Sequence, residues 1–425
     1  MNAEIPTRLD VESYCLKLAR QARFASRELA MLSSSVKDSW LLDAADELVE
    51  NASTVIEANQ KDLENAPQYG MSEAAVDRLR IDHVAIQGMA NGLREIAGLR
   101  DPVGETIEGW VRPNGLEIRK VRVPLGTVIF IYESRPNVTV DAAAICVKSG
   151  NAVVLRGGKE AIHSSTALVR LLDQVGLRRG IPKGAVQLVD TPDRAVVGGL
   201  LQLNNLIDVV VPRGGKELIE RVVNEAKMPV IKHFDGNCHV YVDESAELTM
   251  AESIVVNSKC HRLGVCNACE SLLIHKSLTN SFLPEIATAL LRNGIELRGD
   301  ATVCQVIPEA VLGTDQDWGT EYLGPVISVC IVESLQAAIN HINRYGSHHT
   351  DAIVTQDFES ARQFQQQVDS SAVMVNASTR FHDGGQFGLG AEIGISTDKL
   401  HARGPCGLKE LTTYKYLVVG NGQTR

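Results

Sequence analysis

Apolar residues recur at three- and four-residue spacing through the first part of the chain, a period typical of amphipathic helices. It predicts helices over residues 11–31, 36–59 and 74–99. An Asn114–Gly115 pair then separates two extended segments, which is a strong signal for a β-hairpin. The second arm of the hairpin alternates apolar and charged residues, so residues 110–123 are expected to form a ribbon with one solvated face.

From residue 126 to residue 212 the pattern changes to short Val- and Ile-rich runs separated by helical periods. The runs predict strands over residues 127–132, 152–155, 185–189 and 207–211. The periods between and after them predict helices at about 138–148, 160–175, 193–203 and 216–226, followed by a strand at 229–232. Nearly continuous apolar strands joined by helices are typical of a parallel sheet that is covered on both faces.

The same alternation continues from residue 238 to residue 356 and predicts a second α/β region. Strands are expected over residues 240–242, 271–274 and 326–332, and helices over 250–261, 281–293 and 335–343. The remaining residues are rich in glycine around 384–394 and end in a strand-like segment at 414–419. The predicted fold class is therefore α/β, with two sheet-containing regions.

The segment Arg-Gly-Gly-Lys-Glu occurs twice, at residues 156–160 and 213–217, each time after an apolar run and before a helical period. A strand that ends in glycines and leads into a helix presents backbone N–H groups to a phosphate. Two such turns on one parallel sheet favour a nucleotide-type ligand. Two ordinary glycine-containing turns would give the same pattern.

The overall composition limits the class of protein. Of the 425 residues, 44% are hydrophobic and 22% are charged, as in an ordinary globular protein large enough for two domains. The formal net charge of −10 argues against nucleic acid or an anionic membrane as the main partner. The first residues are polar, and we expect neither a targeting signal nor a membrane span. Nine scattered cysteines fit no disulfide framework and favour the reducing cytoplasm.

Cys266 is the first candidate for chemistry. It follows a glycine in the loop predicted between the helix at 250–261 and the strand at 271–274. Three neighbouring residues with cationic or titratable side chains, which favour a thiolate, are Lys259, His261 and Arg262. These features make Cys266 a candidate nucleophile.

Three alternatives stay open for this cysteine. Cys266 and Cys269 form a C-x-x-C pair, which is also typical of redox proteins. Cys260, His261, Cys266 and Cys269 together could bind zinc, although no second ligand pair follows at the usual spacing. A packed cysteine with no chemical role is the third alternative.

Two polar residues lie at turns where a ligand would bind. Asn137 follows a proline just after the strand at 127–132, where its amide can donate to a developing oxyanion or cap a helix. Glu321 precedes a Gly-Pro turn, where its carboxylate can accept from a ribose hydroxyl or simply face solvent.

These pieces follow one order: a Pro-Leu-Gly turn before a strand, the Pro136–Asn137 pair, two glycine turns, a loop cysteine, and Glu321 ahead of Gly-Pro-Val. This order resembles the aldehyde dehydrogenase superfamily over essentially the whole chain. Three longer stretches are similar to the branch of the superfamily that acts in proline biosynthesis, namely residues 133–141, 155–160 and 398–405.

The resemblance implies an aldehyde dehydrogenase-like fold, with a Rossmann-type cofactor domain on a parallel sheet, an α/β catalytic domain and a β-ribbon oligomerisation element. The N-terminal helices and the NADP-binding domain are expected over residues 1–235, and the catalytic domain over 236–365. Residues 366–425 are expected to return to the cofactor domain and to end in an oligomerisation strand, which joins the hairpin at 110–123 in linking subunits.

The resemblance also implies roles for single residues. Cys266 matches the catalytic nucleophile, and Asn137 matches the donor that stabilises the oxyanion together with the Cys266 backbone N–H. Gly214 and Gly215 match the turn at the cofactor pyrophosphate. Glu321 matches the residue that holds the nicotinamide ribose.

The chain departs from the common pattern near the cofactor and the nucleophile. Arg156 lies where the family places a lysine near the adenosine ribose, and Lys159 where many NAD enzymes carry an acid, which favours NADPH. His233 is the best match for a water-activating glutamate, so oxidation of an aldehyde to an acid is not expected. Arg135 and Arg262 lie near catalytic candidates and are predicted to bind the substrate phosphate, although ordinary surface arginines look the same.

The activity that the resemblance implies is the NADPH-dependent reduction of γ-glutamyl phosphate to glutamate-5-semialdehyde and phosphate, through a thioester on Cys266. Reduction of another acyl phosphate stays open as an alternative, as does a thiol-redox or zinc-binding protein. The expected partners are the small-molecule substrate, an upstream glutamate 5-kinase and further copies of the chain. No metal is expected.

Overall fold

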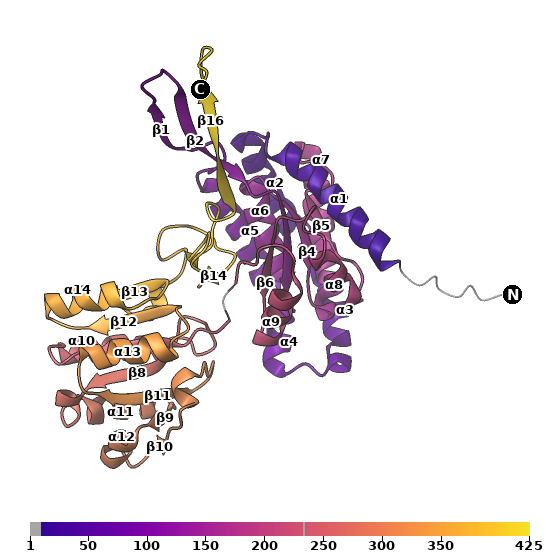
Figure 1. Cartoon of the computed structure of the whole chain (residues 1–425). Helices are drawn as coiled ribbons and strands as arrows, with labels where there is room; N and C mark the ends of the chain where they lie inside the picture. The colour runs from indigo at the N-terminus through magenta and orange to yellow at the C-terminus, as the bar shows by residue number, and fades with distance from the viewer. Residues whose placement is uncertain (1–9, 233) are drawn as a thin grey trace. The chain divides into compact units, whose positions relative to one another are not determined.

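The computed structural model describes residues 10–232 and 234–425. The chain forms two compact units (Figure 1). The first comprises the chain up to Lys232 together with Leu389–Gly394 and Cys406–Arg425, and the second comprises His233–Gly388 and Ile395–Pro405. Each unit is built on a parallel sheet with helices, which confirms the predicted α/β fold class.

The first unit begins with helices α1 (Val11–Leu29), α2 (Ser34–Glu50), α3 (Ala52–Asn65), α4 (Glu73–Leu79) and α5 (His83–Gly98). Two predicted helices are wrong in extent, because the predicted 36–59 helix breaks at Asn51 and the 74–99 helix breaks before His83. At the second break the Asp82 side chain accepts from the Ala85 backbone N–H at 2.8 Å and caps α5. The apolar period continues across both breaks, so the pattern gave no sign of them.

The sheet of the first unit has four parallel strands in the order β5-β4-β3-β6. Their bounds are β3 (Thr127–Tyr132), β4 (Ala152–Arg156), β5 (Val186–Leu188) and β6 (Val209–Arg213). The helices that join or follow them are α6 (Pro136–Lys148), α7 (Ile162–Arg179), α8 (Ala195–Leu201) and α9 (Lys216–Glu225). The predicted strand at 229–232 is wrong, since those residues contribute a single bridge between Val230 and Val210.

The strand order determines where the two glycine turns lie. Strands β4 and β6 flank β3 on either side and run in the same direction. The turns that follow them, at Gly157–Gly158 and Gly214–Gly215, therefore open at the same carboxyl edge of the sheet, as expected for a ligand-binding edge of an open α/β sheet.

The predicted hairpin is confirmed and gains a third strand. Strand β1 (Thr106–Val111) turns through Gly115, whose φ of 85° favours glycine, into β2 (Glu117–Pro124). The C-terminal strand β16 (Thr412–Val419) pairs antiparallel with the whole of β2 (Figure 1). The large side chains exposed on this three-stranded sheet include Ile107, Trp110, Val111, Tyr414, Tyr416 and Val418.

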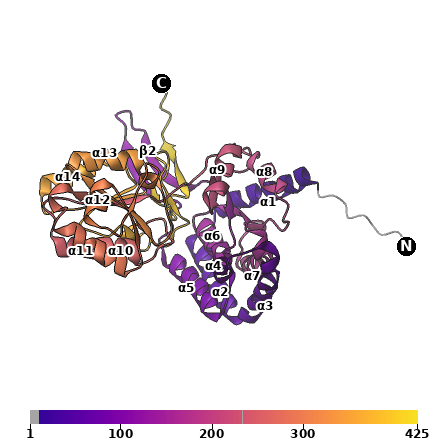
Figure 2. The ribbon, with the colours of Figure 1, turned by 90° about the horizontal axis from the view of Figure 1, so that it is seen from below.

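The second unit contains a seven-stranded parallel sheet in the order β10-β9-β11-β8-β7-β12-β13. Its strands are β7 (Cys238–Val242), β8 (Cys269–His275), β9 (Glu296–Gly299), β10 (Val311–Leu312), β11 (Val326–Val332), β12 (Thr350–Val354) and β13 (Ala372–Val375). Its helices are α10 (Leu248–Cys260), α11 (Phe282–Arg292), α12 (Ala301–Val306), α13 (Leu335–Tyr345) and α14 (Phe358–Gln367). Helices α10 and α11 cover one face, and α13 and α14 cover the other (Figure 2).

The side-chain alternation of a strand explains these two apolar layers. Val240 and Val242 of β7 pack with α10 and α11, whereas Tyr241 between them packs with Ile339 of α13 and Phe364 of α14. The sheet is therefore buried on both faces, as the apolar runs predicted.

The predicted return to the first unit at residue 366 is wrong. Strand β13 pairs in parallel with β12 and so extends the sheet of the second unit. The short strands β14 (Ile395–Ser396) and β15 (Gly404–Pro405) pair with each other and also belong to the second unit. Residues 389–394 and the residues from Cys406 onward belong to the first unit.

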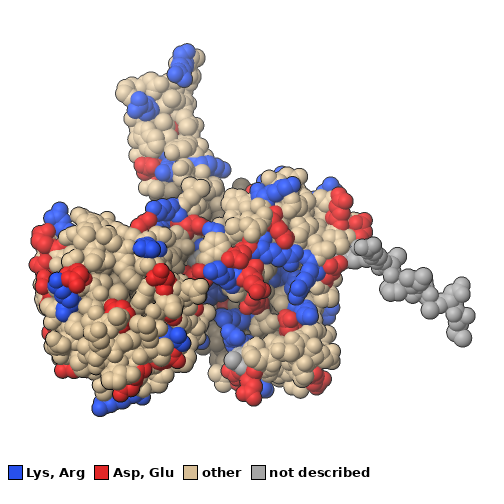
Figure 3. All heavy atoms as spheres, turned by 60° about the horizontal axis from the view of Figure 1, so that its bottom comes forward, with Lys and Arg blue, Asp and Glu red and all other residues tan. Residues whose placement is uncertain are grey.

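The surface carries both signs of charge. On the face drawn in Figure 3, acidic and basic side chains are interspersed over both units. Within residues 10–232 and 234–425, no helix is both long and apolar enough to cross a membrane. The predicted cytoplasmic location stays a prediction.

Candidate active site

Cys266 lies in the turn between α10 and β8 and is partly buried. Its backbone carbonyl accepts a hydrogen bond from the Cys238 thiol, with 3.2 Å between oxygen and Sγ. Gly236, two residues before β7, lies directly against it, because a Cβ built on Gly236 would stand 2.0 Å from the Cys266 carbonyl oxygen. The predicted nucleophile is therefore held by a backbone contact that only glycine allows.

A second segment of the chain supports the same turn. The Thr379 hydroxyl donates to the Asn267 carbonyl at 2.7 Å, and the Asn267 side-chain amide donates to the His382 carbonyl at 3.0 Å. Thr379 opens the short 3₁₀ helix η5 (Thr379–Phe381). The residue next to the nucleophile is thus tied to a segment more than a hundred positions away in the sequence.

Arg380 is a functional candidate that the sequence reasoning missed. Burial lowers the pKa of Arg380, while the nearby Cys266 raises it and Arg262 lowers it again. Arg380 therefore lies close enough to Cys266 for their charges to interact, and a guanidinium at that place favours the thiolate form of a cysteine. The Arg380 Nε atom also donates to His261 Nδ1 at 3.4 Å. No motif around residue 380 pointed to this role.

The other predicted neighbours of the thiolate behave differently. Lys259 is fully buried, and its Nζ lies 2.5 Å from Glu270 Oε2, so its charge is paired inside the unit rather than directed to Cys266. Cys269 is also buried, and burial raises the pKa of its thiol to about 12. Its thiol donates to the Ser271 carbonyl at 3.3 Å. Cys269 therefore stays protonated at neutral pH, which disfavours the redox-pair alternative.

The residues described contain no group of three or more His, Cys, Asp or Glu side chains arranged to hold a metal ion. Cys260, one of the residues considered for zinc, is partly buried, and burial raises the pKa of its thiol. A zinc ligand must be a thiolate, so this environment does not favour the zinc alternative.

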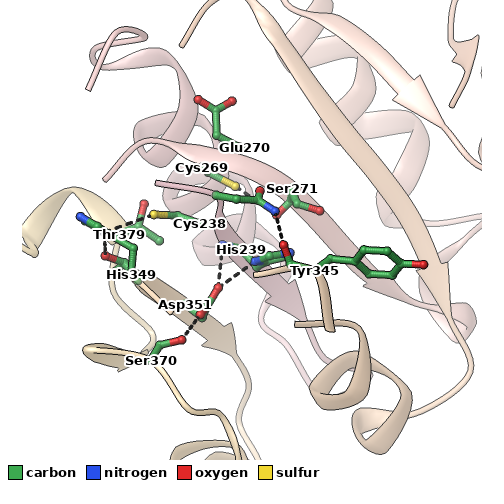
Figure 4. A network of polar contacts seen from close by, with 12 residues as sticks. Cys238, His239, Cys269, Glu270, Ser271, Tyr345, His349, Asp351, Ser370 and Thr379 are labelled. Carbon is green, nitrogen blue, oxygen red and sulfur yellow. Dashed lines mark hydrogen bonds and ion pairs between the residues drawn. The ribbon is translucent and has the colours of Figure 1, made fainter. Parts of the chain in front are cut away.

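A buried polar network lies beside the nucleophile turn (Figure 4). The Cys238 thiol is hydrogen-bonded to His349 at 3.6 Å, and His349 and His382 both bond the Thr350 hydroxyl at 2.7 Å. Burial lowers the pKa of His382 to about 4, so this histidine is neutral at physiological pH. These hydrogen bonds hold the strand ends beside the nucleophile turn in place, and His382 adds no charge there.

Glu321 lies in the loop before β11 and bonds the segment that supports Cys266. Its Oε1 accepts from the Gly236 backbone N–H at 2.8 Å. Two residues further on, the Leu323 N–H donates to Glu270 Oε1 at 3.2 Å, and Leu323 has a φ of 51°. Burial raises the pKa of Glu270 to about 7, while Lys259 opposes the shift. The loop is thus held to the core by a buried ion pair.

Asn137 is the second residue of α6, after Pro136. The N-cap of this helix is Arg135, so the alternative that Asn137 caps the helix is wrong. The Asn137 side chain is exposed and its Nδ2 donates to Asp141 Oδ2 at 3.5 Å. Burial raises the pKa of Asp141 to about 6. Since an amide has two N–H bonds, one directed to Asp141 orients the other.

Four basic residues line one cavity at the carboxyl edge of the first sheet. They are Arg156, Lys159, Arg194 and Arg221, around a volume of about 310 Å³. Burial lowers the pKa of Arg156, Glu160 raises it, and the positive charges of Arg194 and Arg221 lower it. Three glutamates, Glu133, Glu160 and Glu217, line the same cavity, and guanidiniums placed there can bind an anion. The sequence reasoning found Arg156 and Lys159 but missed the two other arginines, which lie outside any motif.

Lys159 has a second contact in this region. Its Nζ lies over the ring of Tyr69, 4.6 Å from the ring centroid. A cation–π contact of this kind holds the ammonium near the cavity mouth while leaving it hydrated.

Backbone N–H groups at or after the two glycine turns donate to carboxylates. At the second turn, the Gly215 N–H donates to Glu133 Oε1 at 2.9 Å, so the N-terminus of α9 already holds a carboxylate. After the first turn, in the first residues of α7, the N–H groups of His163 and Ser164 donate to Asp62, at 3.1 and 2.8 Å. The expectation that the two glycine turns present N–H groups to a phosphate stays a prediction.

The two arginines predicted to bind phosphate lie in different units. Arg135 is exposed and lines a cavity of about 390 Å³ in the first unit, together with Arg78, Arg194 and Glu133. Arg262 is exposed in the second unit, near Arg380. His233, the residue matched to a water-activating glutamate, lies outside the described residues.

Comparison with known proteins adds the family. The model of the aldehyde dehydrogenase family matches residues 12–318 and 299–415. A gamma-glutamyl phosphate reductase of Rhodopirellula baltica is 61% identical over 416 residues, which cover 98% of this chain and 96% of that protein. A protein of the same name from Geobacter metallireducens is 52% identical over 96% of this chain and 98% of its own length.

Solved structures agree with the sequence comparison. A crystal structure of gamma-glutamyl phosphate reductase from Thermotoga maritima has a TM-score of 0.95 and 42% identity, covering 97% of this chain and 99% of its own. An acetylating aldehyde dehydrogenase of Geobacillus thermoglucosidasius has a TM-score of 0.68 at 17% identity, covering 98% of each chain, and bears on the fold alone.

Proposed function

Because the chain belongs to the aldehyde dehydrogenase family, and within it to the γ-glutamyl phosphate reductases, we propose that it reduces γ-glutamyl phosphate to glutamate-5-semialdehyde and phosphate. This reaction is the second step of proline biosynthesis from glutamate. The observation that carries the proposal is the high identity over nearly the full length to relatives of that name.

The chemistry of the proposal is centred on the Cys266 thiolate. It attacks the acyl carbon of γ-glutamyl phosphate, the bond from that carbon to the phosphate oxygen breaks, and a thioester and free phosphate result. When bound, NADPH supplies the hydride that reduces the thioester. The reduced thioester is a tetrahedral oxyanion; its carbon–oxygen double bond re-forms, the carbon–sulfur bond breaks, and the aldehyde leaves with the thiolate restored.

Charged and polar side chains assist these steps in the proposal. Asn137 and the Cys266 backbone N–H donate to the oxyanion of each tetrahedral intermediate. Arg380 favours the thiolate by its position beside Cys266. Arg262 and Arg135 supply planar donors that suit the oxygen atoms of the acyl phosphate and of the departing phosphate.

Members of this family use a nicotinamide cofactor, and the first unit fits the phosphorylated form. In the proposal, Arg156, Lys159, Arg194 and Arg221 hold the 2′-phosphate, because guanidinium and ammonium groups in one cavity suit a dianion. Gly214 and Gly215 hold the pyrophosphate after Glu133 leaves that turn. Glu321 holds the nicotinamide ribose.

We predict a marked preference for NADPH over NADH. Replacing Arg194 with alanine removes one cation from the cavity and is expected to raise the KM for NADPH about 10- to 100-fold, the value of one charge-assisted hydrogen bond. Replacing Lys159 with glutamate removes a cation and adds an anion, and should raise this KM at least as much. The KM for NADH should change much less. Steady-state kinetics with both cofactors measures this, with Arg170→Ala, an exposed arginine of α7, as the matched control. A wild-type enzyme that uses NADH equally well contradicts the prediction.

The function is tested most directly in the reverse direction. With glutamate-5-semialdehyde and NADP⁺, we expect reduction of NADP⁺ to require added phosphate and to yield little free glutamate. Phosphate is a nucleophile at neutral pH and needs only to be positioned, whereas water needs a general base. Sustained turnover without phosphate, with glutamate accumulating, would show a hydrolytic aldehyde dehydrogenase instead.

The oligomeric state is also a proposal. The three-stranded sheet β1-β2-β16 exposes aromatic and branched side chains such as Trp110 and Val111, at 39% and 67% of their surface. An apolar surface of this kind is typical of a subunit contact. Analytical ultracentrifugation should find a homo-oligomer that Trp110→Glu dissociates, and a monomeric wild-type chain would refute the proposal. Passage of substrate from a glutamate 5-kinase stays a prediction.

A further inference from the structure

The loop that carries Glu321 is connected to the nucleophile turn within the second unit by one short path. Glu321 bonds the Gly236 N–H, and Gly236 lies against the Cys266 carbonyl. We propose that Glu321 is a positioning residue for Cys266, acting through Gly236, in addition to any contact with the cofactor. The proposal rests on Cys266 being the nucleophile of the proposed function.

The contact between Gly236 and Cys266 is close enough to transmit a displacement. A Cβ on Gly236 would stand 2.0 Å from the carbonyl oxygen of Cys266 and 2.7 Å from its Cα. Gly236 is buried, and its own carbonyl accepts from the Cys238 N–H at 2.8 Å, at the start of β7. A shift of Gly236 therefore meets the backbone of Cys266 rather than empty space.

The Glu321 loop is rigid enough to hold Gly236. The Leu323 N–H is bonded to Glu270, whose other oxygen pairs with the fully buried Lys259. A buried ion pair keeps its geometry, because separating the two side chains would leave each charge unpaired in an apolar interior. Glu321, whose carboxylate bonds Gly236, therefore lies two residues from Leu323, which is bonded to this buried ion pair.

A second bond links the same two segments. The side-chain amide of Asn237, which is 2% exposed, donates to the Trp318 carbonyl and to the Tyr345 carbonyl, each at 2.9 Å. Trp318 precedes Glu321 in the same loop. Residues 236 and 237 are therefore both held by this loop, one through its backbone N–H and one through its side chain.

This arrangement separates two roles of one carboxylate. A ribose contact exists only when cofactor is bound, whereas the bond to Gly236 is made by the protein alone. The positioning role must therefore be detectable in the enzyme without any cofactor. The reactivity of Cys266 towards iodoacetamide, measured by mass spectrometry of the Cys266 peptide, reports on it directly.

In cofactor-free enzyme we expect Glu321→Ala to increase the alkylation rate of Cys266 about tenfold, because the turn loses a support and the thiol becomes more accessible. At saturating substrate and NADPH, the same variant should lower kcat by about tenfold or more, because the thiol is misplaced. Glu321→Gln keeps an oxygen that accepts from Gly236, so its alkylation rate should match wild type while its NADPH affinity falls. Glu359→Ala, an exposed acid of α14, is the control.

Gly236→Ala tests the contact between Gly236 and Cys266 directly, because the added Cβ must displace the Cys266 backbone. It should also raise the alkylation rate of Cys266, and circular dichroism would confirm that the variant is folded. If Glu321→Ala alters only the KM for NADPH and leaves cofactor-free alkylation at the wild-type rate, the positioning role is refuted. Failure of the proposed function looks different, because complete alkylation of Cys266 in the wild-type enzyme would then leave turnover intact.

Discussion

Replacing Cys266 with alanine is expected to abolish turnover, by a factor on the order of 10⁶, the loss that follows removal of a covalent nucleophile. Without the thiolate no thioester forms, and two nearby thiols of the described residues are poor substitutes: burial raises the pKa of Cys269 to about 12, and it raises the pKa of Cys238 well above its ordinary value. The assay is NADPH oxidation with γ-glutamyl phosphate.

The matched control is Cys269→Ala. This change removes one buried sulfur whose hydrogen bond goes to the backbone of its own strand, so most of the activity should remain. A Cys269→Ala enzyme that is folded and as inactive as Cys266→Ala would overturn the single-nucleophile mechanism and restore a C-x-x-C mechanism.

Replacing Asn137 with alanine is expected to lower kcat by about 10²–10³-fold, the usual loss when one oxyanion donor is removed. The melting temperature should stay close to wild type, because the side chain is exposed and Arg135, not Asn137, is the N-cap of α6. Losing a true cap would instead lower stability by about 1 kcal/mol. Measuring kcat and the melting temperature on the same preparations distinguishes the two roles.

Asn137→Asp sharpens this test, since the aspartate has nearly the same shape but no N–H to donate. It should be as impaired as the alanine variant. The Asn91→Ala change, at an exposed amide of α5, should leave kcat unchanged. Near-normal kcat in Asn137→Ala, with or without a loss of stability, would refute the catalytic role.

The sequence predicted best the strands that are buried on both faces. Strands β3 and β11 have the bounds that their apolar runs predicted, because a strand covered by helices on both sides is apolar at most positions. The sequence also predicted the hairpin at Gly115 correctly, because the positive φ of its turn favours glycine, and an Asn-Gly pair is a recognisable sequence signal for such a turn.

Strand β12 was missed for the opposite reason. All five of its residues are buried, yet it begins with Thr350 and Asp351. The polar pair is tolerated because Asp351 bonds His239 at 2.8 Å and also accepts from Ser370, and Thr350 bonds two histidines. One of these partners, His239, lies 112 residues from Asp351, so the sequence around β12 looks like a polar segment until the fold is known.

For the site, the order of residues along the chain was sufficient to identify Cys266, Asn137 and Glu321 as candidates, because each lies in a turn or loop beside a strand that the sequence predicts. What holds the nucleophile turn is not local. Glu321 meets Gly236 across 85 residues, and Thr379 meets Asn267 across 112. Hydrogen bonds and close backbone contacts over such separations leave no periodic trace in the sequence, since each depends on where the sheet brings its strand ends.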